Sequence, residues 1–544
     1  MQLPDIAAAS PEALGEAVSK ELSTHHRLLP PRHDYGALLG HVEAITRLMK
    51  GVAARPSIEP ARGDVIFARK GWRGSRPLTV MALHDAVVYR FLCDRLAVQL
   101  PERLRSRPPA REFKELLLSE EDVTHIAVTD VTAYYEFVDH GLLADELVAQ
   151  TGDEPLVVQL LTALRGVMGR DLGLPQIHQS SDILGDTYID PVRRRLRRHG
   201  FKTLSYSDDF RIGATTLSEA KRALEVCSAE MRLLGLVQNE RKTFTWSRER
   251  YQEDLGSFAA AERGLFEGVD VLQDFWVDLY GEEEELAEAA SLAANPLGGG
   301  IDEGDVDFDT PGPASIPKYD VTPTLLSAAE RALEIWLDEG EDDDTQSRKG
   351  AAITQSLLGR ALPILGAGGS SGPLANASAI LLYEPALTPQ FASYLIQYSK
   401  RNGDRRVEVR DALDEIVDKA VLSDWQAIWI AYVAGFLRGS QASRPHVRWL
   451  HWAVEHGRDA VAAHAAAALG SIGRGDPETL AMGVGRVGPV WRSLALWGLA
   501  RISTQLAEEV AEDGIERVLV GRPDGHGPQG RSAARPRRQR AKRS

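Results

Sequence analysis

The spacing of apolar residues divides the chain into a mixed first half and a helical second half. Between residues 124 and 250, short apolar runs alternate with longer segments of helical periodicity. The predicted strands are 124–130, 202–206 and 211–215, and the predicted helices are 141–169, 181–199 and 217–235. This layout predicts an α+β domain in which helices back a small sheet.

Beyond residue 345, apolar residues recur every three or four positions, and Gly or Pro separates the periodic segments. The predicted helices are 388–400, 423–438, 446–456, 459–470 and 488–502. Short loops between them predict antiparallel helix pairs, as in HEAT-like repeats. Six tryptophans are interpreted as packing residues of these helices rather than stacking platforms: Trp425, Trp429, Trp449, Trp452, Trp491 and Trp497.

The charge of the 544-residue chain is uneven, and the average of -15 hides this. Residues 281–320 are acidic and rich in Gly and Pro, which predicts a flexible linker. The acidic run 338–344 predicts a loop, and residues 522–544 form a basic tail that either holds nucleic acid or has no binding role. Residues 51–120 are net basic, so the overall charge does not exclude a nucleic-acid partner.

Composition excludes several classes of protein. Cys93 and Cys227 are the only cysteines, which excludes a disulfide framework and a cysteine-ligated zinc site. We expect no membrane partner, because no run of eighteen apolar residues occurs and the N-terminus lacks the pattern of a signal peptide. The expected location is the cytoplasm.

The sharpest chemical feature is the sequence Tyr206-Ser207-Asp208-Asp209 between two predicted strands. Asp130 ends another predicted strand. Three carboxylates at neighbouring strand ends would form an oxygen-rich pocket for hard divalent cations such as Mg²⁺. An Asp-Asp pair alone is also common at a solvated hairpin tip, so the interpretation depends on the surrounding residues.

Five segments between about residues 65 and 250 carry a resemblance. They are Arg76-Pro77-Leu78-Thr79-Val80 with Asp85 and Val88, Asp130 to His140, Gly173-Leu174-Pro175-Gln176 with Ser181, Leu184 and Tyr188, Tyr206 to Asp209, and Gly235 to Thr243. These five segments and their order along the chain resemble the sequence motifs of the reverse transcriptases, the RNA-directed DNA polymerases. The resemblance implies a right-hand polymerase fold with fingers and palm, and addition of deoxynucleotides by a two-metal mechanism.

The resemblance also implies a role for each site residue. Asp130, Asp208 and Asp209 would be catalytic and would hold two Mg²⁺ ions, with Mn²⁺ as an alternative, together with the carbonyl of Val131. Tyr135 would be the steric gate that excludes a ribose 2′-hydroxyl; the alternative is a tyrosine of the core.

Three further residues would contact the incoming deoxynucleoside triphosphate. Gln176 would lie near its sugar, and Arg76 would neutralise triphosphate oxygens. Lys242 would assist charge neutralisation or protonate the leaving group; the alternative is a solvated surface lysine.

Four features depart from the family pattern or need a separate interpretation. Ile177 stands where the family usually has Gly, which puts ordinary templated copying in doubt, and Asp182 stands where Pro is common. His178 is interpreted as a local contact without a catalytic role. The basic run 193–198 either faces a phosphate backbone or is a solvated helix surface.

The predicted domains are 1–120 (N-terminal helices and fingers), 121–280 (palm), 281–320 (linker), 321–521 (HEAT-like repeats) and 522–544 (tail). A polymerase core followed by helical repeats resembles the bacterial abortive-infection and other defence-associated reverse transcriptases. This implies a role in antiphage defence, with untemplated or protein-primed synthesis as one form. Tyr383, Tyr394, Tyr398 and Tyr432 are conceivable primers, although core packing is the simpler role for each.

Two alternatives stay open. One is a retron-like or intron-derived enzyme that copies a dedicated RNA, and the other is a catalytically inert scaffold that binds nucleic acid. The expected partners are deoxynucleoside triphosphates, RNA or DNA, and a phage or host protein trigger. We also expect a homo-oligomer, because helical repeats often mediate assembly.

Overall fold

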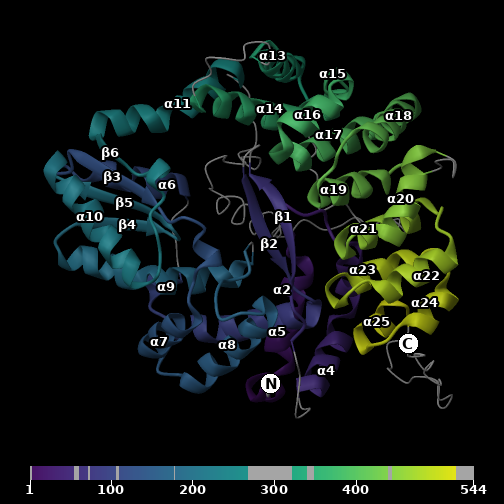
Figure 1. Ribbon diagram of the computed structural model, residues 1–544, viewed down its shortest axis with the longest axis horizontal. Helices are drawn as coiled ribbons and strands as arrows, with labels where there is room; N and C mark the ends of the chain where they lie inside the picture. The colour runs from purple at the N-terminus through teal and green to yellow at the C-terminus, as the bar shows by residue number, and fades with distance from the viewer. Residues whose placement is uncertain are drawn as a thin grey trace, which may run out of the picture.

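The computed structural model describes residues 3–53, 60–70, 74–105, 110–176, 178–266, 321–339, 348–438 and 444–521. The predicted linker, the basic tail, Ile177 and residues 340–344 of the acidic run lie outside these residues. Strands and helices alternate up to residue 266, and only helices follow from residue 321 (Figure 1). The predicted order of a mixed α+β half (residues 3–266) and a helical half (residues 321–521) is therefore confirmed for the described residues.

The main sheet has four antiparallel strands in the order β4-β5-β3-β6. They are β3 (His125–Asp130), β4 (Lys202–Tyr206), β5 (Asp209–Ala214) and β6 (Phe244–Ser247). The central strands β3 and β5 are buried along nearly their whole length, because both of their faces are covered. β5 begins two residues earlier than predicted, so Asp209 is a strand residue and lies opposite Asp130 in the register.

Four helices connect the strands of the sheet: α7 (His140–Thr151), α8 (Glu154–Met168) and α9 (Gln179–Arg198) lie between β3 and β4, and α10 (Leu217–Leu233) lies between β5 and β6. α9 packs on β4, and α10 packs on β3 and β5. The prediction of one helix over 141–169 was wrong. Gly152 takes a left-handed conformation with φ of 71°, and Asp153 then caps a new helix by accepting the backbone N–H of Leu156.

The N-terminal residues form helices and a hairpin. The helices are α1 (Pro4–Ala8), α2 (Pro11–Ser23), α3 (His33–Leu38), α4 (Val42–Ala53), α5 (Leu83–Ala97) and α6 (Ala110–Glu115), and α11 (Arg248–Phe266) ends this half. The hairpin joins β1 (Asp64–Lys70) to β2 (Gly74–Val80) and was not predicted, because Pro77 and several charged residues mask the strand pattern.

The helical half stacks helices in an arc around the hairpin (Figure 1). Its helices are α13 (Pro323–Glu339), α14 (Arg348–Gly368), α15 (Gly372–Ala375), α16 (Ala377–Tyr383), α17 (Thr388–Lys400), α18 (Gly403–Lys419), α19 (Asp424–Ala434), α20 (Pro445–His456), α21 (Asp459–Ile472), α22 (Pro477–Arg486), α23 (Pro489–Ala500), α24 (Thr504–Val510) and α25 (Gly514–Leu519). α21 and α23 cross most closely, because a Cβ at Gly470 would collide with the backbone of Gly498.

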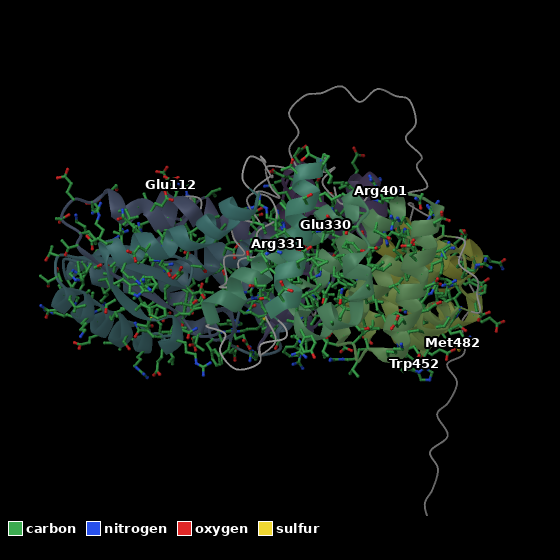
Figure 2. The ribbon with its side chains drawn as sticks, turned by 90° about the horizontal axis from the view of Figure 1, so that it is seen from above. Glu112, Glu330, Arg331, Arg401, Trp452 and Met482 are labelled. Carbon is green, nitrogen blue, oxygen red and sulfur yellow. The ribbon has the colours of Figure 1, made fainter. Side chains whose placement is uncertain are left out.

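Four of the six tryptophans are buried in the helical half, as predicted: Trp425, Trp429, Trp491 and Trp497. Trp452 differs, since 55% of it is exposed, and Figure 2 shows it at the surface of the helical half. Of the four tyrosines named as conceivable primers, Tyr394, Tyr398 and Tyr432 are buried, whereas Tyr383 is 64% exposed.

The two halves are packed against each other. The His33 ring stacks on Trp497 with centroids 4.6 Å apart, and Trp425 donates its indole N–H to the carbonyl of Leu28. At the opposite end of the arc, α11 lies against α13 and α14 (Figure 1). The apolar core of the helical half also includes Ile66, Ala68 and Leu78 of the hairpin.

Within the described residues, every helix is too short or too polar to cross a membrane.

Candidate active site

The structure brings the three predicted acids together at one end of the sheet. Asp130 is the last residue of β3, and Asp209 is the first residue of β5 directly opposite it. Asp208 lies in the turn between β4 and β5, where Ser207 takes a positive φ of 50°. The backbone N–H of Val131 donates to the carbonyl of Asp208 at 3.2 Å and ties the turn to β3. A non-glycine residue at positive φ is strained, and such strain is often found at functional sites.

The carboxyl group of Asp208 is unfavourable in its charged form. Burial, together with repulsion from Asp130 and Asp209, raises its pKa to about 7, while Lys242 acts in the opposite direction. A buried carboxylate beside two others is unfavourable unless a cation lies near it. Asp208 is therefore the carboxylate at which added positive charge would be most stabilising.

Asp130 is held by the loop that follows α10. The ammonium group of Lys242 lies 2.6 Å from Oδ2 of Asp130, and the side-chain amide of Asn239 donates to Oδ1 at 3.3 Å. The backbone N–H of Asn239 also donates to the Asp130 carbonyl at 2.8 Å. Lys242 is thus part of the acidic cluster and is not a solvated surface lysine.

Asp209 has a different environment from its neighbour. Its carboxylate forms an ion pair with the buried guanidinium of Arg211, which donates to the Tyr251 hydroxyl at 3.1 Å. The Tyr251 hydroxyl in turn donates to the carbonyl of Lys114 at 2.9 Å. Although burial acts to lower it, the pKa of Arg211 is raised by Asp209 and Tyr251. Asp209 is consequently already neutralised by the protein.

The ion pairs of Asp130 and Asp209 determine whether the acids are arranged as metal ligands. Among the described residues, no group of three or more His, Cys, Asp or Glu side chains is arranged around a common point as metal ligands. The reason lies in the contacts above, since Asp130 turns toward Lys242 and Asp209 toward Arg211. The oxygen donors nevertheless fit a hard cation, because Asp208 is held among carboxylates whose repulsion such an ion would relieve.

Val131 is placed so that its carbonyl faces the same cluster. It forms an antiparallel bridge with Gln238, flanked by the hydrogen bond from Thr132 N–H to the Val237 carbonyl at 2.9 Å. In such a pair the N–H and C=O of the central residue both point away from the partner strand. Because the Val131 N–H points to Asp208, its carbonyl points to that side also.

Tyr135 lies beside the Asp208 turn. Its hydroxyl donates to Oδ1 of Asp182 at 2.9 Å and lies 3.0 Å from the Ser207 hydroxyl. Its neighbour Tyr134 is buried, and the Tyr134 hydroxyl donates to the Gly185 carbonyl at 2.5 Å. Tyr134 is therefore the core tyrosine of the pair, and Tyr135 is the partly buried one at the site.

The segment that carries Gln176 is held next to Tyr135. The backbone N–H of Leu174 donates to the carbonyl of Tyr135 at 2.7 Å, and that of Gly173 donates to Val138 at 2.8 Å. Gln176 follows two residues later and is partly buried. Backbone contacts thus hold the segment that leads to Gln176 beside Tyr135.

The hairpin carries Arg76 and, close to it, Lys70, a residue that the sequence does not single out. Arg76 lies on β2 opposite Ala68, and Lys70 is the last residue of β1. Loss of hydration, together with repulsion from Lys242 and Arg76, lowers the pKa of Lys70 to about 8, while Asp130 and Asp208 act in the opposite direction. These influences identify Lys70 as a neighbour of the site. The apolar run 65–68 before Lys70 is the signal that could have revealed its strand.

Two other predictions are resolved by contacts. His178 is buried, caps α9 by accepting the N–H of Ser180 at 3.3 Å, and lies 3.2 Å from a Glu21 oxygen, which agrees with a local structural role. Asp182 is the partner of Tyr135 described above.

The basic run 193–198 is largely engaged within the protein. Arg193 pairs with Asp190 at 3.2 Å, and Arg194 pairs with Glu146 at 2.6 Å. Arg195 pairs with Glu230 at 3.5 Å, and Arg197 donates to the Thr203 carbonyl. Four arginines of the run thus meet protein acceptors in this structure, and the choice between a phosphate-binding face and a solvated helix surface stays a prediction.

No protein-family model and no curated protein matches the chain. The residues and their geometry therefore carry the functional argument.

Proposed function

We propose that the protein is a DNA polymerase of the reverse transcriptase type. The observation that carries this proposal is the cluster of Asp130, Asp208 and Asp209 at one sheet end, with the cationic residues Lys70 and Lys242 beside it. Carboxylates and lysines placed this close together suit a nucleoside triphosphate bound with divalent cations, since the carboxylates bind the cations and the lysines bind phosphate oxygens.

Asp130, Asp208 and the Val131 carbonyl would hold two Mg²⁺ ions, with Mn²⁺ as an alternative, and Asp209 would complete the charge. When bound, these ions supply activation of the attacking 3′-hydroxyl and stabilisation of the pyrophosphate leaving group. The residues of the chain position the reactants. Binding at Asp130 would require Lys242 to leave its present partner, which makes its ammonium group available to the phosphates.

The remaining predicted residues would select and orient the nucleotide. Arg76 and Lys70 would contact phosphate oxygens from the hairpin. Tyr135 would lie under the sugar and exclude a 2′-hydroxyl, with its ring fixed by Asp182 and Ser207. Gln176 would contact the nucleotide near its sugar.

We infer a role in antiphage defence in the cytoplasm from the resemblance to abortive-infection reverse transcriptases and from the helical half that follows the α+β half. RNA or DNA, a phage or host protein trigger and a second copy of the chain are the partners that this role implies. If synthesis is protein-primed, Tyr383 is the most accessible of the four tyrosines considered, because the other three are buried.

The proposal predicts that the purified full chain incorporates labelled deoxynucleotides in the presence of Mg²⁺ or Mn²⁺ and that chelation of the metal abolishes this activity. Sequencing of nucleic acid that co-purifies with the protein distinguishes copying of a dedicated RNA from untemplated synthesis. A single structured RNA would favour the retron-like alternative, and DNA without a matching template would favour untemplated synthesis. Absence of incorporation with every template, primer and metal tested would contradict the proposal.

A second prediction concerns Lys70. Because its pKa is about 8, its ammonium group is largely charged at pH 7 and largely neutral at pH 9. The KM for deoxynucleotide should therefore rise by up to about tenfold between these pH values. In Lys70→Arg the guanidinium stays charged, and the rise in KM should be much smaller. Equal rises in both proteins would show that Lys70 does not contact the nucleotide.

A further inference from the structure

The hairpin that carries Lys70 and Arg76 is packed on the helical half through one face. Side chains alternate along a strand, so Ile66, Ala68 and Lys70 share a face of β1, and the register places Arg76 opposite Ala68 on the same face. Ile66 and Ala68 are buried in the core of the helical half. A displacement of this face against the helices would therefore move Lys70 and Arg76 as well.

The other face of the hairpin is less supported. A pocket of about 310 Å³ lies between this face and the ends of α19 and α21. Its lining includes Phe67 and Arg69 from β1, and Asp424 and Arg458 from the helical half. This face of the hairpin therefore meets the helical half across a pocket and not through a close-packed core.

One directed contact fixes the base of the hairpin to the helical half. The indole N–H of Trp491, on α23, donates to a carboxylate oxygen of Asp64 at 2.7 Å across a sequence separation of 427 residues. Trp491 is only 1% exposed, and its ring is held between the Arg32 guanidinium at 5.1 Å and the His464 ring at 5.2 Å. Contacts other than the one with Asp64 therefore orient the indole ring and its N–H group.

The preceding residue anchors the hairpin to the other half. The backbone N–H of Gly63 donates to the carbonyl of Val167, at the end of α8, at 2.9 Å. The base of the hairpin is thus attached to the α+β half at Gly63 and to the helical half at Asp64.

We propose that Trp491 and Asp64 are positioning residues through which the helical half holds the β1–β2 hairpin, and with it Lys70 and Arg76, at the nucleotide site. The consequence for nucleotide binding rests on the proposed polymerase function. A molecule that binds the helical half and shifts α23 would change nucleotide affinity through this contact.

Trp491→Phe tests the proposal, because it removes the N–H donor and keeps an aromatic ring. We expect the KM for deoxynucleotide to rise about three- to tenfold, the size of effect that loss of one ordinary hydrogen bond produces, with kcat changed less than about twofold. Trp429→Phe is the matched control. It removes a buried indole donor of the same half, which bonds to the Leu28 carbonyl at 3.3 Å, and should leave the KM unchanged.

Asp64→Ala removes the same contact from the hairpin side, and Asp64 is only partly buried, so this variant tests the proposal if Trp491→Phe does not fold. An unchanged KM in Asp64→Ala and Trp491→Phe, or an equal rise in Trp429→Phe, would overturn the positioning role.

Amide hydrogen exchange tests the link between Trp491 and the hairpin without relying on nucleotide incorporation. Peptides covering residues 64–70 and 74–80 should exchange faster in Trp491→Phe than in wild type or in Trp429→Phe. If wild type incorporates no nucleotide, the proposed function fails, while faster exchange still supports the link to the hairpin. Unchanged exchange in Trp491→Phe would refute the link.

Discussion

Replacing Asp208 by asparagine is expected to lower nucleotide incorporation by at least about 10³-fold while leaving the protein as stable as wild type or more stable. The loss of activity follows from removal of a charge that would hold both metal ions. The gain in stability follows from the raised pKa of Asp208, because burial and two neighbouring acids make its charged form unfavourable in the folded state.

The sign of this effect can be checked by pH. The folded-state pKa of about 7 exceeds the ordinary 3.8, so wild type loses stability as pH rises between these values. Measured without divalent ions, the Tm of Asp208→Asn should exceed that of wild type by about 1–3 °C above pH 7, with no difference near pH 4. The comparison needs only thermal melts at several pH values.

Asp209→Asn is the matched control, since it removes the adjacent carboxylate. Asp209 neutralises the buried Arg211, so this variant should be less stable than wild type, in contrast to Asp208→Asn. Retained incorporation by Asp208→Asn would contradict the polymerase proposal. Loss of incorporation with retained phage protection would favour the scaffold alternative.

The second large effect is expected on stability. Arg211→Met should lower the free energy of unfolding by about 3 kcal/mol, because it leaves Asp209 without its partner and the Tyr251 hydroxyl without its donor. The guanidinium also lies 5.6 Å from the centre of the Phe113 ring, and that contact would be lost as well. A fall of several degrees in Tm would report this loss.

A surface arginine of the same half provides the control. Arg195 is largely exposed and pairs with Glu230 at 3.5 Å, so Arg195→Met should change stability by less than about 0.5 kcal/mol. The double variant Arg211→Met with Asp209→Asn should recover part of the loss, since no unpaired carboxylate remains. A double variant as unstable as Arg211→Met would show that the ion pair is not the cause.

The sequence predicted the parts of the site that depend on local pattern. Strand ends can be recognised from apolar runs, and the sequence therefore predicts Asp130 and Asp208 at the end of the sheet. The predicted β5 begins two residues late, because two adjacent acids indicate a turn, whereas Arg211 neutralises Asp209 and allows it to be a strand residue.

Features that depend on long-range contacts could not be predicted. The β1–β2 hairpin has a strand pattern that Pro77 and charged residues obscure. The sequence does not show which face of the hairpin is buried, because that face packs on helices more than 300 residues away in the chain. The basic run of α9 was ambiguous for the same reason. Its acceptors include Glu146 on α7 and Glu230 on α10, which only the fold brings near.

The shared core of the hairpin and the helical half has a consequence for synthesis of the chain. Ile66, Ala68 and Leu78 leave the ribosome long before the helices that cover them, such as α19 and α23. At 5–20 residues per second, this interval is roughly 20–80 s. During that time the apolar face of the β1–β2 hairpin is not covered by these helices, so we expect a nascent chain to need chaperone protection until its last helices have emerged.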